Sequence, residues 1–97
     1  MNALHWTERA QVDLAAIQAF IEADSPTYAK IVVRRLISAV DPLRDFPNVG
    51  RAVEEFPDPS VREVVLRPYR IVYRIVSSDV IHILTIHHSA RGPISAL

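Results

Sequence analysis

The segment from Val61 to Arg91 constrains the fold most strongly, because it predicts three consecutive β-strands. The pieces VREVVL, YRIVYRIV and VIHILTIH are rich in β-branched and aromatic residues, and short turn sequences separate them. In YRIVYRIV the tyrosines and isoleucines occupy one face, whereas Arg70 and Arg74 lie on the other. We predict that the Tyr/Ile face packs against a core and that the Arg face is partly exposed to solvent.

The links between these strands predict how the strands pair. Residues 77–79, with sequence SSD, are suited to a three-residue hairpin loop. In that register Arg74 faces His82 across the hairpin, and Arg70 faces Ile86. The dipeptide RP before YRIVYRIV does not supply the positive φ of tight hairpin turns, so we predict a wider turn there.

Two amphipathic helices precede the strands. Thr7 is a suitable N-cap for a helix that extends to about residue 23. Ser25 and Pro26 begin a second helix that extends to about residue 44, with a kink or an end near Pro42. Apolar residues recur at spacings of three and four, at Ala10, Leu14, Ile17 and Ile21 and then at Ala29, Val33, Leu36, Val40 and Leu43. The charged residues of both helices, including Asp13, are expected to form a solvated face.

The remaining segments are a strand and a loop. Residues 3–6 are a short apolar run that predicts an N-terminal strand, and residues 46–60 contain three Pro and one Gly, which predicts a loop. The loop is expected to be held against the domain by Phe46, Val49, Val53 and Phe56. We predict a single α+β domain over residues 1–97. In it an N-terminal strand and a three-stranded antiparallel meander form one sheet, and an antiparallel helix hairpin covers one face.

Composition excludes several function classes. Eleven basic and eleven acidic residues leave a net charge of zero, which argues against binding nucleic acid by charge alone. The chain has no Cys, so it has no disulfide and no Cys-based metal site. No apolar run approaches the roughly 18 residues that span a membrane, and MNALHWTER is not a signal peptide. We expect a cytoplasmic protein without a cofactor and without a membrane partner.

A set of Arg and His residues forms the main candidate site, namely Arg62, Arg70, Arg74, His82, His87, His88 and Arg91. Arg stabilises developing negative charge and His transfers protons near neutral pH, so such a set could cleave RNA without a metal. The alternative is that these are polar residues of a solvated sheet face. Adjacent strand residues point to opposite faces, and His82 lies about 20 Å from His88 along a strand, so we predict no metal site.

Six segments, in this order and spacing, carry a resemblance to a known family. They are WTERAQVDLAAIQAFI, the helix break DSP, LRDFPNVGR, VREVV, PYRIVYRI and a closing strand with HHSAR, and they extend over nearly the whole chain. The chain resembles the RelE/ParE superfamily of toxins from bacterial type II toxin–antitoxin systems, and it is most similar to the ParE-like branch. Several members of that branch poison DNA gyrase.

The resemblance implies a toxin that inhibits DNA gyrase when free, is not itself an enzyme, and is neutralised by a cognate antitoxin. The antitoxin is expected to bind by strand addition or by docking a helix. The residues expected to contact the target are Arg62, Arg70, His88 and Arg91, on the exposed sheet face and in the C-terminal tail. Replacing Arg91 and truncating after Ser89 are each expected to abolish growth arrest and to leave the fold intact.

The same superfamily implies an alternative, a metal-independent endoribonuclease that cleaves mRNA on the ribosome. Members similar to YoeB use Glu, Arg, His and a terminal Tyr. Arg70 matches the strand Arg of that set and His88 matches its His, whereas Ser89 stands where the Tyr is expected. Glu54 or Glu55 is the candidate base. A third possibility is a degenerate toxin that is retained only as an antitoxin-binding module.

Overall fold

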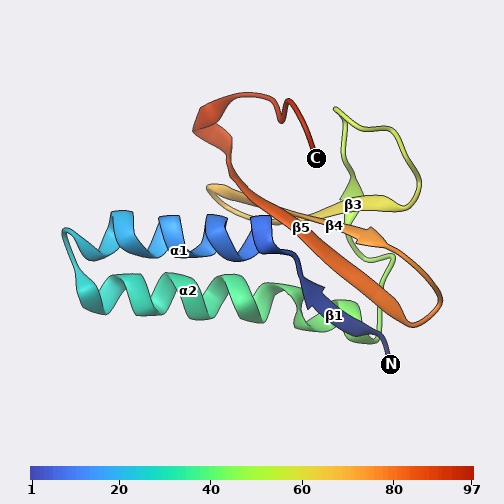
Figure 1. The fold of residues 1–97 in the computed structure, drawn as a ribbon, viewed down its shortest axis with the longest axis horizontal. Helices are drawn as coiled ribbons and strands as arrows, with labels where there is room; N and C mark the ends of the chain where they lie inside the picture. Colours follow the sequence, from blue (N-terminus) through green and yellow to red (C-terminus); the bar gives the residue numbers. More distant parts are fainter.

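Five strands form one mixed sheet, and two helices cover one of its faces, in the computed structural model of residues 1–97 (Figure 1). The strands are β1 (Ala3–Trp6), β2 (Arg51–Ala52), β3 (Val61–Leu66), β4 (Tyr69–Ile75) and β5 (Val80–His88). The helices are α1 (Glu8–Glu22) and α2 (Pro26–Val40), and the 3₁₀ helices η1 (Asp41–Arg44) and η2 (Ser89–Arg91) follow α2 and β5. The predicted α+β fold and its antiparallel meander are confirmed.

The N-terminal strand pairs with the last strand of the sequence, so the first and last strands lie side by side in the sheet. The strand order is β1-β5-β4-β3-β2. β1 runs parallel to β5, whereas the other neighbouring strands are antiparallel. Because α1 begins two residues after β1 ends, this pairing places the start of α1 beside β5 (Figure 1).

Both α-helices begin at the predicted caps. The side chain of Thr7 accepts a hydrogen bond from the N–H of Ala10, and the side chain of Ser25 accepts one from the N–H of Tyr28. Each cap therefore satisfies a backbone donor that has no partner within its helix. α2 gives way to η1 next to Pro42, because proline removes a backbone donor and cannot continue an α-helix.

The main core lies between the helices and the Tyr/Ile face of β4, as predicted. Its buried members are Ala10, Val32, Leu36, Val40, Leu43, Ile71, Tyr73, Ile81, Ile83 and Ile86. One position on α2 differs from the prediction: Val32 is buried, whereas the predicted Val33 is only half-buried. Spacings of three and four residues both return to one helix face, so the pattern alone did not separate these two positions.

A second, smaller core covers the opposite face of the sheet and consists of Val53, Val61, Val72 and Ile94, with Phe56 and Leu84 packed against them. The prediction of a partly exposed face is therefore wrong over its centre, because the loop before β3 and the C-terminal tail (residues 92–97) cover it. Val53 and Phe56 hold the loop as predicted. Phe46 and Val49 do not, since they are 65% and 64% exposed.

A β-bulge interrupts the pairing of β4 with β5. Arg74 pairs with His82, which confirms the register predicted from the hairpin loop. The register then shifts between Val72 and Tyr73, so Leu84 on β5 is an extra residue without a partner. A bulge of this kind changes the face on which all following side chains lie.

Beyond the bulge the pairing differs from the prediction by one residue. Arg70 pairs with His87, so the predicted pairing with Ile86 is wrong. His88 pairs with Tyr69 and therefore lies on the side of the sheet that faces the helices. Without the bulge, alternation would have placed His88 on the opposite face, together with Arg70.

The link between β3 and β4 is shorter than predicted. Leu66 pairs directly with Tyr69, so Arg67 and Pro68 form the turn alone, and the peptide bond between them is cis. The prediction of a wider turn is wrong, because Leu66 and Tyr69 pair directly across the two residues and no non-Gly residue there takes a positive φ.

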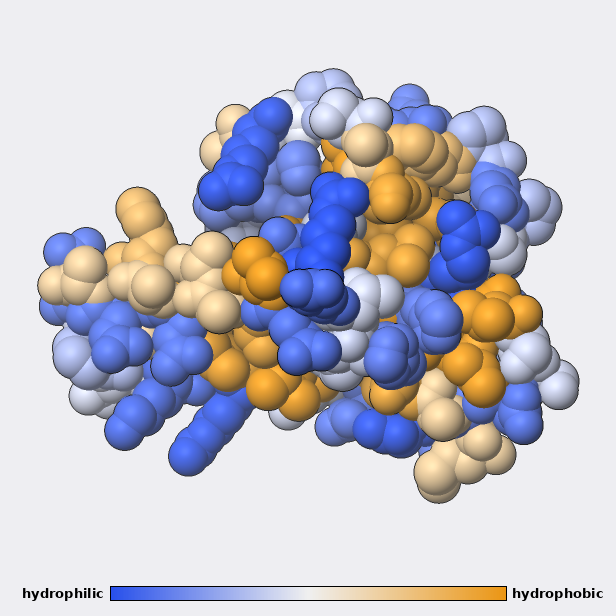
Figure 2. All heavy atoms as spheres, viewed as in Figure 1, coloured by the Kyte–Doolittle hydropathy of each residue, from blue (hydrophilic) through white to orange (hydrophobic).

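The surface carries several separate hydrophobic patches. Figure 2 shows hydrophobic atoms interrupted by hydrophilic ones, both along the helices and in the part of the molecule that contains the sheet. Two of the most exposed large apolar residues, Phe20 at 80% and Val12 at 60%, lie on α1. Neither α-helix is long and apolar enough to cross a membrane.

Candidate functional site

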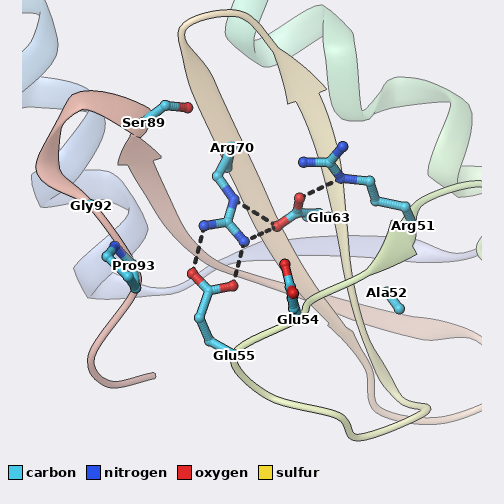
Figure 3. A pocket seen from close by; sticks show the side chains of 9 residues that line it. All are labelled: Arg51, Ala52, Glu54, Glu55, Glu63, Arg70, Ser89, Gly92 and Pro93. Carbon is cyan, nitrogen blue, oxygen red and sulfur yellow. Dashed lines mark hydrogen bonds and ion pairs between the residues drawn. The ribbon is translucent and has the colours of Figure 1, made fainter.

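A polar cleft surrounds Arg70 on the sheet face that points away from the helices (Figure 3). It has a volume of about 740 Å³ and is lined by Arg51, Ala52, Glu54, Glu55, Glu63, Arg70, Ser89, Gly92 and Pro93. These residues come from the loop before β3, from β2, β3 and β4, and from the segment after β5. Distant parts of the sequence therefore meet at Arg70.

Two carboxylates hold the Arg70 guanidinium. Nη1 and Nη2 donate to the two oxygens of Glu55 at 2.7 and 2.8 Å, which makes a bidentate ion pair. Nε and Nη2 donate to Oε1 of Glu63 at 2.9 and 2.6 Å. Of the five N–H groups, one on Nε, one on Nη1 and two on Nη2 are thus bonded within the chain.

The charges of this cluster balance. Oε2 of Glu63 accepts a hydrogen bond from Nε of Arg51 at 2.6 Å, so two arginines face two glutamates. The side chain of Glu63 is 1% exposed and that of Arg70 is 14% exposed. A carboxylate so deeply buried would be costly without such partners. Because the four charges cancel, they leave no net positive charge in the cleft for a phosphate.

Glu55 also joins the cluster to the C-terminal tail. Its Oε2 accepts a hydrogen bond from the backbone N–H of Ile94 at 2.8 Å. Hydrogen bonds from Arg70 and then from Ile94 lower the pKa of the Glu55 carboxyl to about 2. The hydrogen bonds to Glu55 and then to Glu63 raise the pKa of Arg70. A carboxylate with so low a pKa is a poor general base near neutral pH.

The residues predicted to contact the target do not form one site. Arg62 pairs with Tyr73 and lies on its side of the sheet, where it donates to the carbonyl of Gly50 at 2.9 Å. Arg70 lies on the other face among its ion pairs, and the bulge places His88 on the helix side. The expectation that these three residues share an exposed sheet face is therefore wrong.

His88 and Arg91 line a second groove, between α1 and the end of β5. The groove has a volume of about 420 Å³, and its lining is Asp13, Ala16, Ile17, Phe20, Tyr69, Ile86, His88, Ala90 and Arg91. The rings of Tyr69 and His88 meet edge to face, with centroids 5.3 Å apart. Arg91 is exposed, and its guanidinium makes no hydrogen bond or ion pair within the chain. Nδ1 of His88 accepts a hydrogen bond from the N–H of Ala90 at 3.0 Å. The groove therefore combines an apolar floor with one guanidinium, that of Arg91, which is free to bind a partner.

The other Arg and His residues of the predicted set do not line either site, and their side chains contact other parts of the protein. Arg74 donates to a carboxylate in the loop before β3 at 3.2 Å. Nε2 of His87 lies 2.7 Å from the carbonyl oxygen of Gly92, and the ring of His82 lies 5.0 Å from that of His5. No group of three or more His, Asp or Glu side chains is arranged to hold a metal ion.

Sequence reasoning missed two acidic residues that organise these sites. Glu63 lies two residues after Val61 in VREVVL and therefore on the same face of the strand, and this shared face was the one sequence signal of its burial. Asp13 is not part of a solvated face. Its carboxylate accepts hydrogen bonds from the hydroxyl of Thr85 and, at 3.1 Å, from the N–H of Ile86. No sequence signal indicates this contact, because the partners lie more than 70 residues away.

Comparisons with known proteins give one consistent result. A family model described as the ParE toxin of the type II toxin–antitoxin system parDE matches residues 4–93. Toxin RelE2 of Caulobacter vibrioides is 36% identical over 91 residues, which cover 94% of this chain and 99% of that protein. Putative toxin Y4kP of Sinorhizobium fredii is 46% identical over 88 residues, which cover 89% of this chain and 86% of that protein.

Two solved structures share the fold. A chain of the chromosomal ParDE toxin–antitoxin system from P. aeruginosa is 31% identical with a TM-score of 0.73, and the match covers 91% of this chain and 96% of that one. YafQ from E. coli strain BL21(DE3) has a TM-score of 0.53 at 11% identity, over 94% of this chain and 97% of that one. At so low an identity, the likeness to YafQ concerns the fold alone.

Proposed function

The chain belongs to the ParE toxin family of type II toxin–antitoxin systems, and we propose that it inhibits DNA gyrase in the cytoplasm when it is free of its antitoxin. A toxin of this type has a cognate antitoxin as its partner. On this proposal His88 and Arg91 contact gyrase, and the contact is one of binding rather than of catalysis.

The free guanidinium of Arg91 is the observation that carries this proposal. Arg91 is exposed beside an apolar groove, and nothing within the chain uses its donors. Arginine is enriched at protein–protein interfaces and among the residues that contribute most to binding. Arg62 and Arg70 also belong to the proposed contact set, but both already donate hydrogen bonds within the chain. We therefore give Arg91 and His88 the larger role.

The separation of Arg70 from His88 favours target binding over RNA cleavage. A ribonuclease would need both side chains at one phosphodiester, and here they lie on opposite faces of the sheet. Glu55 and Arg70 do meet, with Ser89 in the same cleft. However, Glu55 neutralises Arg70 and has a lowered pKa, so neither side chain is poised for that chemistry. The likeness to the ParDE system supports the same choice.

The proposal is tested by inducing the protein in cells that lack the antitoxin. We expect growth arrest with a DNA damage response and intact mRNA, and inhibition of supercoiling by purified gyrase. Arg91→Ala is expected to weaken this inhibition more than tenfold, as for an arginine central to an interface. Arg34→Ala, at an exposed position on α2, is the matched control and should leave inhibition unchanged.

Other outcomes would replace the proposal. Rapid mRNA cleavage without a DNA damage response would identify a ribonuclease, and Arg70 and His88 would become candidates for its chemistry. Normal growth with soluble, folded protein would indicate a module that only binds its antitoxin.

Truncation after Ser89 is not a clean test, in contrast to the expectation from sequence. It removes Ile94, which is 4% exposed in the second core and whose N–H is bonded to Glu55. Loss of growth arrest would then report a damaged fold as well as a missing contact. Substitution of the exposed Arg91 avoids this ambiguity.

A further inference from the structure

We propose that Glu55 is a positioning residue, which holds the C-terminal tail so that Arg91 is presented to the target in one fixed arrangement. This inference rests on the proposed function, because it gives Arg91 the role of a target contact. It assigns to Glu55 and Arg70 a structural task in place of the catalytic one that the ribonuclease alternative would give them.

Three N–H groups from two distant parts of the chain converge on the Glu55 carboxylate. Nη1 and Nη2 of Arg70 approach it at 2.7 and 2.8 Å, and the backbone N–H of Ile94 approaches it at 2.8 Å. Arg70 cannot shift freely, because the buried Glu63 holds the other edge of its guanidinium. Figure 3 shows Arg70 lying between these two carboxylates, with the segment after β5 beside them. The tail is thus tied to β4 through Glu55, and beyond Ile94 it is also held by Arg9 of α1, which donates to the carbonyl of Ala96 at 2.9 Å.

The turn that carries Arg91 is fixed at both of its ends. At its start the N–H of Ser89 donates to the carbonyl of Pro68 at 2.9 Å. At its end Gly92 takes a φ of 75°, which reverses the chain, and its carbonyl oxygen lies 2.7 Å from Nε2 of His87. Ile94 then enters the second core, two residues beyond the reversal. Arg91 therefore lies on a short segment between two anchors.

The hydrogen bond to Glu55 orients the backbone at Ile94, which burial of the Ile94 side chain alone does not do. Apolar burial is non-directional, so the Ile94 side chain could stay buried while the backbone around it turned. A hydrogen bond to a carboxylate is directional and stronger than one between neutral groups. It fixes the orientation of the Ile94 peptide and, through it, the course of the chain back to Arg91.

Glu54 provides a matched control. It is the neighbour of Glu55, it lines the same cleft and it is exposed, but its side chain makes no hydrogen bond within the chain. Glu55→Gln keeps the shape of the side chain, removes its charge and leaves one oxygen to accept from the three N–H donors that now share two carboxylate oxygens. Glu54→Gln removes the same charge and disturbs no bond.

The test measures amide hydrogen exchange at Ile94 and growth arrest in the same variants. For Glu55→Gln we expect exchange at Ile94 to become more than tenfold faster, as for the loss of a hydrogen bond to a charged group, while amides of β4 stay protected. The expression level needed for growth arrest should rise about tenfold, since a loose tail presents Arg91 correctly only part of the time. Glu54→Gln should match the wild-type protein in both measurements.

Each opposing result has a distinct meaning. Fast exchange at Ile94 in the wild-type protein would overturn the proposal without any variant. Unchanged exchange in Glu55→Gln would overturn it as well, and so would a loosened tail with undiminished growth arrest. Failure of the proposed function is a separate result, in which Arg91→Ala keeps wild-type growth arrest or gyrase is not inhibited.

Discussion

Arg70 and Tyr73 lie three residues apart on β4, face opposite sides of the sheet, and each fixes a loop through its polar atoms. Arg70 binds Glu55 in the loop before β3. Tyr73 is 0% exposed, and its hydroxyl donates to the carbonyl of Pro47 at 2.6 Å and accepts from the N–H of Gly50 at 3.0 Å. Two side chains of β4 therefore position the segment between η1 and β3: Tyr73 holds it at Pro47 and Gly50, and Arg70 holds it at Glu55.

Tyr73→Phe tests how much the buried hydroxyl contributes to stability. The substitution leaves the Gly50 N–H and the Pro47 carbonyl without their partner, so we expect the free energy of unfolding to fall by about 1–3 kcal/mol. Urea denaturation measures it. Tyr28→Phe is the control, because that residue is 50% exposed and its hydroxyl makes no hydrogen bond within the chain. Equal effects in both variants would show that the buried hydroxyl has no special role.

At the level of elements, α1 and β5 are joined at the point where the β-bulge disturbs the sheet. The bulge leaves Leu84 unpaired with β4, and β1 ends its pairing with β5 at Ile83. Beyond these points no strand accepts the hydrogen bond of the Ile86 N–H, and the carboxylate of Asp13 on α1 accepts it instead. The same carboxylate lines the groove of His88, so the join between the two elements also shapes the proposed target site.

Asp13→Ala should weaken this join. The hydroxyl of Thr85, a residue that is 3% exposed, and the N–H of Ile86 would lose their acceptor. We expect a loss of about 1–3 kcal/mol in the free energy of unfolding and faster hydrogen exchange at Ile86. Glu22→Ala, an exposed acidic residue of the same helix, is the control and should change stability by less than about 0.5 kcal/mol. Slow exchange at Ile86 in Asp13→Ala would mean that another group accepts this bond.

At the scale of the whole molecule, local patterns predicted the elements, whereas contacts distant in sequence decided the site. Thr7 and Ser25 marked the helix starts because capping involves residues only three positions apart. The alternation in β4 assigned its two faces correctly for the same reason. The sequence of β5 gives no signal of the bulge at Leu84, because this strand is apolar at nearly every position. The bulge alone places His88 on the helix side of the sheet.

The polar cluster shows the same limit of sequence reasoning. Family resemblance marked Arg70, and it named Glu55 as one of two candidate bases. It did not indicate that Glu55 would neutralise Arg70, because that pairing depends on how the loop before β3 folds over the sheet. Nor did any pattern indicate that Ile94 would return the tail to this cluster, since a single apolar residue has no periodicity to read.

The response of the whole fold to acid follows from the pKa of Glu55. The pKa of this carboxyl falls from 4.5 to about 2 on folding, so the unfolded chain binds its proton first as the pH decreases. The stabilisation by the ionised Glu55 is present above about pH 4.5 and is lost as the pH falls toward 2. The pKa of Asp58 is lowered by hydrogen bonds from Ser60, which adds a loss in the same direction.

Comparison of the wild-type protein with Glu55→Gln isolates the contribution of this one group. Urea denaturation at a series of pH values should show the wild-type protein as the more stable form near neutral pH. The difference should shrink as the pH falls from about 4.5 toward 2, because Gln does not titrate and the effect of Asp58 is common to both proteins. Parallel curves over this range would mean that Glu55 ionises alike in the folded and unfolded chains. In that case its bonds to Arg70 and Ile94 would not contribute to stability through its charge.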